Sequence, residues 1–213
     1  MKIALIGATG HVGSWILKEL MSRGHAVTAL VRDPAKLAGN AGVTPVVADV
    51  TDAAAVARAV AGHDVVISAY NSGWGDPAIY DKFLAGSRAI VAGAEVAGVG
   101  RLLVVGGAGS LEVAPGAQLV DQPQFPAEWK DGALAARDLL TELRGETALD
   151  WTFFSPAILS EDGPRTGKYR LGGDQLLVDE KGESRVSWAD FAVAVVDEAE
   201  AGKHRRTRVA VAY

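Results

Sequence analysis

Three glycines near the start of the chain have the spacing of a phosphate-binding turn. They follow an apolar run over residues 3–6 and open a segment with helical periodicity. Gly7 permits a tight turn, Gly10 lets the backbone approach a pyrophosphate, and Gly13 permits close packing of helix on strand. The start of the helix adds free N–H groups and a partial positive charge. We therefore predict a dinucleotide site made by Gly7, Thr9, Gly10, His11, Val12 and Gly13; the alternative is a glycine-rich turn without a ligand.

Arg32 stands at the predicted end of the second strand, where one residue often discriminates between two nucleotides. An acidic residue there normally binds the adenosine ribose hydroxyls, whereas an arginine accommodates a 2′-phosphate. Guanidinium binds phosphate in a fork geometry with charge assistance. The sequence therefore predicts NADP, with NAD as the alternative cofactor. Asp33 beside Arg32 weakens this preference, and a solvated loop cation is the other interpretation of Arg32.

Further cofactor contacts are predicted from position alone, at the ends of later strands. Ligands of open α/β sheets bind in the crevice at the carboxyl ends of the strands. The predicted contacts are Asp49 and Val50 near the adenine ring, Ala69 and Tyr70 beside the ribose, and Gly106 and Pro156 after the later strands.

Short apolar runs alternate with segments of helical periodicity through the first half of the chain. The apolar runs occupy residues 3–6, 26–31, 44–48, 65–69 and 102–105, and the helical segments occupy residues 12–23, 53–60 and 79–96. Uninterrupted, β-branched runs of this length suit strands covered on both faces. The alternation predicts an α/β fold, a Rossmann-type doubly wound parallel sheet with right-handed crossovers.

The second half of the chain is less regular. A helix is predicted over residues 127–144, a strand over 151–155, and a loop with a short hairpin over 160–183. Ser187 is a plausible start for a helix over residues 191–201, and residues 208–212 are predicted to form a final edge strand. We predict one domain over residues 1–213, with a nucleotide-binding core over 1–154 and a small, substrate-side C-terminal elaboration over 155–213.

Five segments of the chain match one known group of proteins. They are residues 3–10, 30–34, 62–67, 103–110 and 187–192. Together with the Gly-x-x-Gly-x-x-Gly spacing, these segments resemble the NmrA-like and flavin/biliverdin-reductase-like members of the atypical short-chain dehydrogenase/reductases. The resemblance covers nearly the whole chain. It implies an NAD(P)-dependent reductase, and it allows a homodimer through the long fourth and fifth helices.

The Tyr–Lys pair of most short-chain reductases is missing from this chain. In such a pair the Lys follows the Tyr by four residues and lowers its pKa, but no Tyr here has a Lys at that spacing. Trp129 and Ala133 have the fitting positions, and neither can transfer a proton. Ser110 is the candidate donor to a substrate oxygen, with a loop hydroxyl that caps its own backbone as the alternative. Trp74 and Trp129 are predicted to line a substrate pocket over the nicotinamide, or else to be packing residues.

The absence of a Tyr–Lys pair indicates which class of hydride acceptor to expect. Hydride transfer to a conjugated acceptor such as a quinone or flavin needs orientation more than a protein acid, because water can protonate the product. We therefore predict an oxidoreductase that acts on such a small-molecule acceptor. The alternatives are an NAD(P)-sensing regulatory protein without turnover and a sugar-nucleotide epimerase or dehydratase, which also depends on the missing Tyr.

Composition excludes several other classes of function. The chain has 213 residues, with 26 Asp and Glu against 21 Lys and Arg, and a net charge of −5. Such a surface does not attract polyanions, so no nucleic-acid partner is expected. Cys is absent and the four His lack chelating spacing, so no metal site is expected. No apolar stretch approaches the roughly 18 residues that span a bilayer, and we expect a cytoplasmic protein without a membrane partner.

Overall fold

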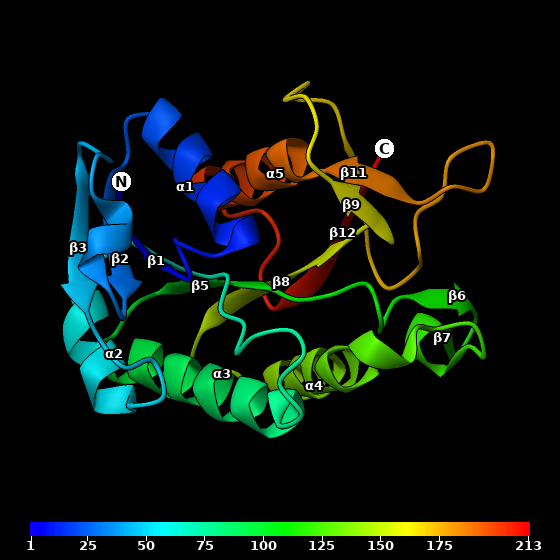
Figure 1. The fold of residues 1–213 in the computed structure, drawn as a ribbon, viewed down its shortest axis with the longest axis horizontal. Coiled ribbons are helices and arrows are strands. Elements are labelled where there is room, and N and C mark those ends of the chain that lie inside the picture. The colour runs from blue at the N-terminus through cyan, green and yellow to red at the C-terminus, as the bar shows by residue number, and fades with distance from the viewer.

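The computed structural model describes residues 1–213 and centres on an eight-stranded sheet (Figure 1). The strand order is β10-β12-β8-β5-β4-β1-β2-β3, and all pairs are parallel except β10 with β12. The strands are β1 (Lys2–Ile6), β2 (Ala26–Val31), β3 (Val43–Val47), β4 (Val65–Ser68), β5 (Arg101–Val105), β8 (Asp150–Pro156), β10 (Arg170–Gly172) and β12 (Thr207–Ala212). The predicted Rossmann-type α/β fold is confirmed.

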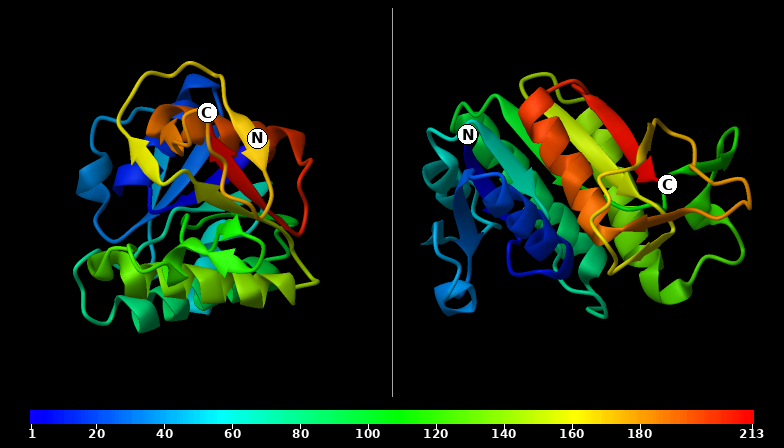
Figure 2. Two further views of the ribbon diagram at one scale, coloured as in Figure 1. Left: turned by 90° about the vertical axis from the view of Figure 1, so that its right-hand side faces the viewer. Right: turned by 90° about the horizontal axis from the view of Figure 1, so that it is seen from above.

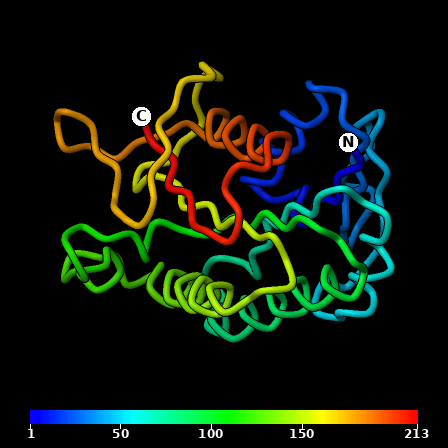
Figure 3. The backbone as a smooth tube through the Cα atoms, turned by 180° about the vertical axis from the view of Figure 1, so that it is seen from behind, coloured from blue at the N-terminus to red at the C-terminus, as the bar shows by residue number.

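Five helices cover the two faces of this sheet. Helices α1 (His11–Ser22) and α5 (Trp188–Ala201) lie side by side on one face (Figure 2), and α2 (Ala53–Val60), α3 (Ile79–Val96) and α4 (Ala127–Arg144) lie on the other (Figure 3). The predicted bounds of α2, α3 and α4 agree with the structure at both ends. None of the helices combines the length and the apolar character that crossing a membrane requires.

Alternate residues of each central strand enter two separate hydrophobic cores. Ile3 and Leu5 pack under α1 and α5, whereas Ala4 and Ile6 pack against the other helical layer. Because both faces of the sheet are covered, apolar residues of these strands point to both faces and not to one face only. This double burial explains the uninterrupted apolar runs in the sequence.

The C-terminal third differs from its prediction in two respects. Residues 160–183 contain no hairpin: β9 (Leu159–Glu161) pairs in parallel with β11 (Arg185–Ser187), and β10 pairs with β12. The prediction that residues 208–212 form an edge strand is also wrong, because β12 lies between β8 and β10. Pairing partners far apart in the chain decide both features, and short strands carry no local signal for such partners.

Small elements complete the connections. The single-turn helix η1 (Pro34–Leu37) follows β2, and a two-stranded hairpin of β6 (Glu112–Ala114) and β7 (Ala117–Gln118) follows β5, leading into η2 (Leu119–Asp121). The strand order reverses its direction at β1, since β2 lies on one side of it and β4 on the other. Such a switch point opens a crevice at the carboxyl ends of the strands.

Candidate dinucleotide site

The three glycines after β1 have three different structural environments. Gly7 has a φ of +82°, and a Cβ atom there would lie 2.4 Å from the carbonyl oxygen of Ala69; a Cβ at Gly13 would lie 2.0 Å from the carbonyl oxygen of Gly7. Both glycines are therefore required by packing of the turn itself. A Cβ at Gly10 would meet only the oxygen of Gly7, at 3.2 Å. Gly10 thus borders open space.

The start of α1 is free of any protein side chain that would cap it. Gly10 is its N-cap residue and no side chain accepts a hydrogen bond from the first turn. Free N–H groups and the helix dipole at such an end attract phosphate. The Val12 side chain packs against the core, so only its backbone faces the turn. Nε2 of His11 lies 3.3 Å from an Asp162 carboxylate oxygen, and its ring packs edge-on against Trp188.

Arg32, Asp49 and Tyr70 follow β2, β3 and β4, and their side chains lie close enough to influence one another's charge. Arg32 is exposed and makes no ion pair with another side chain. Hydrogen bonds from the backbone and hydroxyl of Thr51 lower the pKa of Asp49, and the charge of Arg32 adds to this effect. Asp33 does not neutralise Arg32, because its carboxylate accepts a hydrogen bond from the Ala35 backbone at the start of η1.

Tyr70 is held against α3. Its ring stacks with that of Phe83, and a Cβ on Gly86 would lie 2.5 Å from it. The hydroxyl donates a hydrogen bond to the Lys82 carbonyl oxygen at 3.2 Å. Burial raises the pKa of Tyr70, while the nearby charge of Arg32 lowers it. The Tyr70 ring is therefore held in one position near Arg32.

A cavity of about 470 Å³ lies between α1 and η1, next to the glycine turn. It contains two lysines and no acidic side chain, and its lining residues are Ala8, Thr9, Ser14, Leu17, Lys18, Met21, Lys36, Leu37 and Asn40. Lys36 follows Arg32 by four residues on the adjoining turn. Lys36 was not among the predicted site residues, although its spacing of four residues after Arg32 is a signal that indicates it. The cavity is suited to an anion.

The other predicted cofactor positions lie along the same edge of the sheet. The N–H group of Ala69 donates to the Ile6 carbonyl at 2.9 Å, and Val50 packs partly against the core. A Cβ on Gly106 would lie 1.9 Å from the ring of Phe153, so packing alone accounts for this glycine. Pro156 is buried at the end of β8. Contact of these residues with a cofactor stays a prediction.

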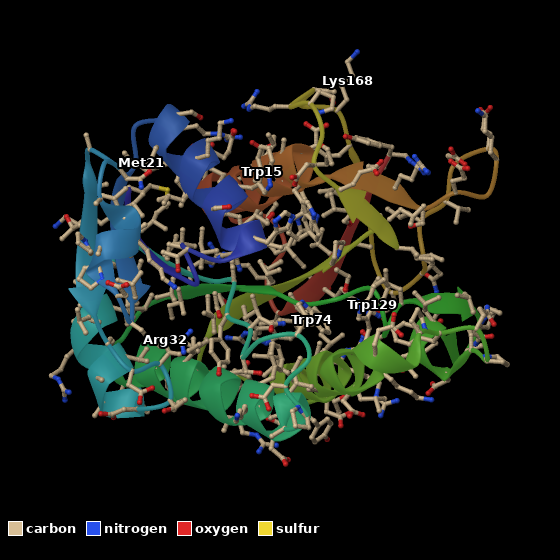
Figure 4. The ribbon with its side chains drawn as sticks, in the orientation of Figure 1. Trp15, Met21, Arg32, Trp74, Trp129 and Lys168 are labelled. Carbon is tan, nitrogen blue, oxygen red and sulfur yellow. The ribbon has the colours of Figure 1, made fainter.

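Two exposed tryptophans stand beyond this crevice. Trp74, in the loop between β4 and α3, is 61% exposed, and Trp129, in the first turn of α4, is 51% exposed. Figure 4 shows both on the same side of the molecule as Arg32, with Arg32 at the left, Trp74 in the centre and Trp129 to the right. The structure thus brings Trp74 and Trp129 to one region, and their contact with a substrate stays a prediction.

Ser110 lies in a different setting. It is 3% exposed, and its hydroxyl oxygen accepts a hydrogen bond from the Arg208 guanidinium at 2.8 Å. Arg208 also binds Asp174, and burial lowers its pKa. A donor role for Ser110 stays a prediction, and it requires the buried hydroxyl to become accessible to the substrate.

The four tyrosine hydroxyls all donate to protein oxygens. Tyr70 donates to the Lys82 carbonyl, and Tyr80, Tyr169 and Tyr213 donate to Asp138, Asp197 and Asp190 respectively. The hydrogen bond to Asp138 raises the pKa of Tyr80, and burial followed by the bond to Asp197 raises the pKa of Tyr169. These shifts run opposite to the lowered pKa of a catalytic tyrosine.

A parallel sheet with a switch point at β1, a tight glycine turn and an uncapped helix start define a dinucleotide-binding Rossmann protein. Comparison of the sequence agrees: a profile of an NAD(P)H-binding family matches residues 7–199. The chain belongs to this NAD(P)H-binding family.

Relatives of similar length share the whole chain. A Bacillus subtilis protein named "Uncharacterized protein YwnB" is 39% identical over 214 residues, which cover 99% of this chain and 98% of that protein. A Burkholderia pseudomallei structure named "Putative exported protein" is 50% identical, with full coverage of both chains and a TM-score of 0.89. A Streptococcus pneumoniae structure named "a putative NADH-flavin reductase" is 36% identical, with a TM-score of 0.85 over 100% of this chain and 99% of that one.

Proposed function

We propose that this protein is an NADP(H)-dependent reductase that transfers hydride to a planar, conjugated small molecule such as a flavin or a quinone. The observation that carries the choice of acceptor is the state of the four tyrosines. All of their hydroxyls are engaged by protein oxygens, and the pKa values of Tyr70, Tyr80 and Tyr169 are raised. An acceptor that takes its proton from water fits such a site.

Residues of the glycine turn and of the strand ends fit the cofactor. The first N–H groups of α1 bind the pyrophosphate, and the open position at Gly10 admits it. Arg32 binds the 2′-phosphate, and Lys36 adds a second positive charge beside the same turn. When bound, NADPH supplies a hydride that, with one proton from water, reduces a quinone or flavin by two electrons and leaves NADP⁺.

The preference for NADP rests on Arg32, a cation that forms no ion pair within the protein. Asp33 is turned toward the Ala35 backbone, and Asp49 toward Thr51. Arg32 is therefore available to an anionic group of the cofactor. The name of the pneumococcal relative supports a flavin as acceptor, and a cytoplasmic location belongs to the proposal because NADPH is regenerated there.

The test is NADPH oxidation with three acceptors: oxidised FMN, a naphthoquinone and an aliphatic ketone. We expect turnover with FMN or the naphthoquinone and none with the ketone, since a localised alkoxide needs a proton donor in the transition state. Efficient ketone reduction would mean that a protein acid exists, and Ser110→Ala in the same assay would show whether Ser110 is that acid. Tight NADPH binding without turnover of any acceptor would favour a nucleotide sensor.

A further inference from the structure

The ring of an exposed tryptophan covers a glycine on α4. Gly132 is buried, and a Cβ on it would lie 2.6 Å from Cζ3 and 3.0 Å from Cη2 of Trp74. It would also lie 3.1 Å from Cδ1 of Ile79. Glycine in a helix interior is less stable than alanine, so the helix loses stability at this position. The Trp74 ring occupies the space that any other residue would fill.

The loop that carries Trp74 is held in a defined shape. Gly73 and Gly75 flank the tryptophan with φ angles of +120° and +85°. The Asn71 side chain accepts a hydrogen bond from the Gly73 backbone at 2.7 Å, and the Asp76 side chain accepts one from the Ala78 backbone at 2.9 Å. The ring is thus fixed on Gly132 at one edge although Trp74 as a whole is 61% exposed.

Trp129 lies on the same helix as Gly132, close to the contact between Trp74 and Gly132. It precedes Gly132 by three residues, so the two positions share one face of α4. No other aromatic ring stacks on Trp74 or Trp129. The two large indole side chains are therefore mostly open to solvent near the first turns of α4, and exposed apolar groups that lie close together can mark a binding site.

The position of the tryptophans relative to the dinucleotide site indicates what binds. The glycine turn follows β1, and Arg32 and Asp49 follow β2 and β3, so the adenosine half lies over that side of the sheet. The reactive half then extends over β4 and β5. The Trp74 loop follows β4, and α4, which carries Trp129, follows β5. Figure 4 shows the same order, with Trp74 between Arg32 and Trp129.

We infer that Trp74 and Trp129 form an aromatic slot for the planar ring of the acceptor, and that Gly132 is the positioning residue that sets Trp74 in this slot. Flat, electron-poor rings stack favourably on indole faces. The inference deepens the proposed function, since it rests on that proposal for the identity of the acceptor as the partner of NADPH. The slot itself rests on the contact between Trp74 and Gly132.

The central variant is Gly132→Ala, with Gly100→Ala as its matched control. A Cβ on Gly100, just before β5, meets nothing within 4 Å. We expect Gly132→Ala to unfold at or above the wild-type temperature, because alanine stabilises the helix, the group that moves most is the Trp74 ring at the surface, and Cδ1 of buried Ile79, at 3.1 Å, has to move only slightly. The probe is oxidised FMN bound in the presence of NADP⁺, which permits no turnover. Its affinity, measured by calorimetry, should fall about tenfold in Gly132→Ala and in Trp74→Ala.

A double-mutant cycle and kinetics separate this role from a structural one. Gly132→Ala should add nothing to Trp74→Ala, because both remove the same ring from the slot. The KM for FMN should rise in both variants while the affinity for NADPH stays as in the wild type. Trp74→Phe should recover part of the FMN affinity.

Three results would overturn the inference. They are an unchanged FMN affinity in Gly132→Ala, additive effects of the two substitutions, and a wild-type dimer in sedimentation that Trp129→Ala dissociates, which would make the tryptophans a subunit interface. Failure of the proposed function is distinct from these. FMN bound through Trp74 without NADPH oxidation would support the slot and contradict the reductase, and oxidation unaffected by the variants would support the reductase and contradict the slot.

Discussion

Gly10 differs from its two neighbouring glycines in what a side chain would meet. A Cβ at Gly13 would lie 2.0 Å from a backbone oxygen, whereas a Cβ at Gly10 meets one atom at 3.2 Å and otherwise open space. Glycine at position 10 is therefore explained better by a ligand than by the fold. The same turn thus contains glycines with a structural role and a glycine with a binding role.

The first prediction follows from this contrast. Gly10→Ala should keep the wild-type unfolding temperature within a few degrees and weaken NADPH binding by about tenfold or more, because the methyl group occupies ligand space. Gly13→Ala should unfold at a much lower temperature because its Cβ clashes with Gly7. Calorimetric titration and thermal unfolding of both variants decide the matter. Undiminished NADPH affinity in Gly10→Ala would show that the pyrophosphate does not approach Gly10.

Arg32 carries the second prediction at the scale of single residues. A hydrogen bond to a charged group contributes about 1.5–3 kcal/mol, roughly a 10- to 150-fold difference in affinity. Arg32→Ala should weaken NADPH binding within this range and leave NADH nearly unchanged, and Lys36→Ala should have a smaller effect that shrinks as salt rises. Titration of NADPH and NADH into the wild type and both variants at one ionic strength measures these changes in affinity, and repeating it at higher salt measures the salt dependence.

The matched control for Arg32 is Arg58→Ala, since Arg58 is an exposed arginine in the last turn of α2. This control should leave the affinity for both nucleotides unchanged. Equal losses of NADPH and NADH affinity in Arg32→Ala, or a wild type that prefers NADH, would show that Arg32 is only a surface cation.

At the scale of elements, the segment after β9, residues 162–165, holds α1 in place through hydrogen bonds. Asp162 accepts a hydrogen bond from Nε1 of Trp15 at 3.2 Å, and Arg165 makes two hydrogen bonds of 2.7 Å to Glu19. The side chain of Arg23, the C-cap residue of α1, also binds Glu19, at 2.7 Å. The C-terminal part of the chain thereby fixes the helix whose start forms the dinucleotide site.

Because Glu19 is ionisable, the hydrogen bonds between this segment and α1 depend on pH. The hydrogen bond from Arg165 lowers the pKa of Glu19 below its ordinary value of 4.5. A carboxyl group with a lowered pKa stabilises the folded state above its unfolded pKa and loses this contribution as the pH falls through the folded value. Glu19→Gln should therefore be less stable than the wild type at neutral pH, and the difference should narrow as the pH falls below about 4.5.

Urea unfolding of wild type and Glu19→Gln between about pH 7 and pH 3 measures this effect. Glu95→Gln is the control, since Glu95 is exposed on α3 and forms no ion pair. A difference between Glu19→Gln and the wild type that is constant over this range would mean that packing, and not ionisation of Glu19, holds the segment to α1.

At the scale of the whole molecule, the C-terminal part shares a hydrophobic core and the central sheet with the first 154 residues. Helix α5 lies beside α1 and contributes Phe191, Val195 and Val196 to one of the two cores. Strand β12 lies between β8 and β10 in the central sheet. The predicted division after residue 154 falls within β8, which has β12 as one of its partners.

A chain that ends at residue 156 should therefore fail to fold cooperatively. It would expose the core surface under α5 and leave β8 as an unpaired edge. Circular dichroism during urea unfolding should show no sharp transition, and the truncated chain should bind a hydrophobic dye. A cooperative transition with NADPH affinity retained would show instead that residues 1–156 form an independent domain.

The features that could be predicted from the chain are those that local interactions specify. Helices α2, α3 and α4 have the predicted ends because helical periodicity stops near glycines and prolines in the same few residues. The glycine turn was predictable because its strand, turn and helix are contiguous in the chain. The doubly wound class followed from the repeated alternation of strand and helix, since each unit specifies its own type.

Contacts between residues far apart in the chain could be known only from the folded structure. Ser110 and Arg208 are 98 residues apart, and Trp15 and Asp162 are 147 apart. The contact between Trp74 and Gly132 and the position of β12 between β8 and β10 likewise join distant parts of the chain. No local pattern encodes such contacts, because they form only when segments far apart in the chain pack together around the two hydrophobic cores. The glycine turn could therefore be found in the sequence, whereas the setting of the tryptophans required the fold.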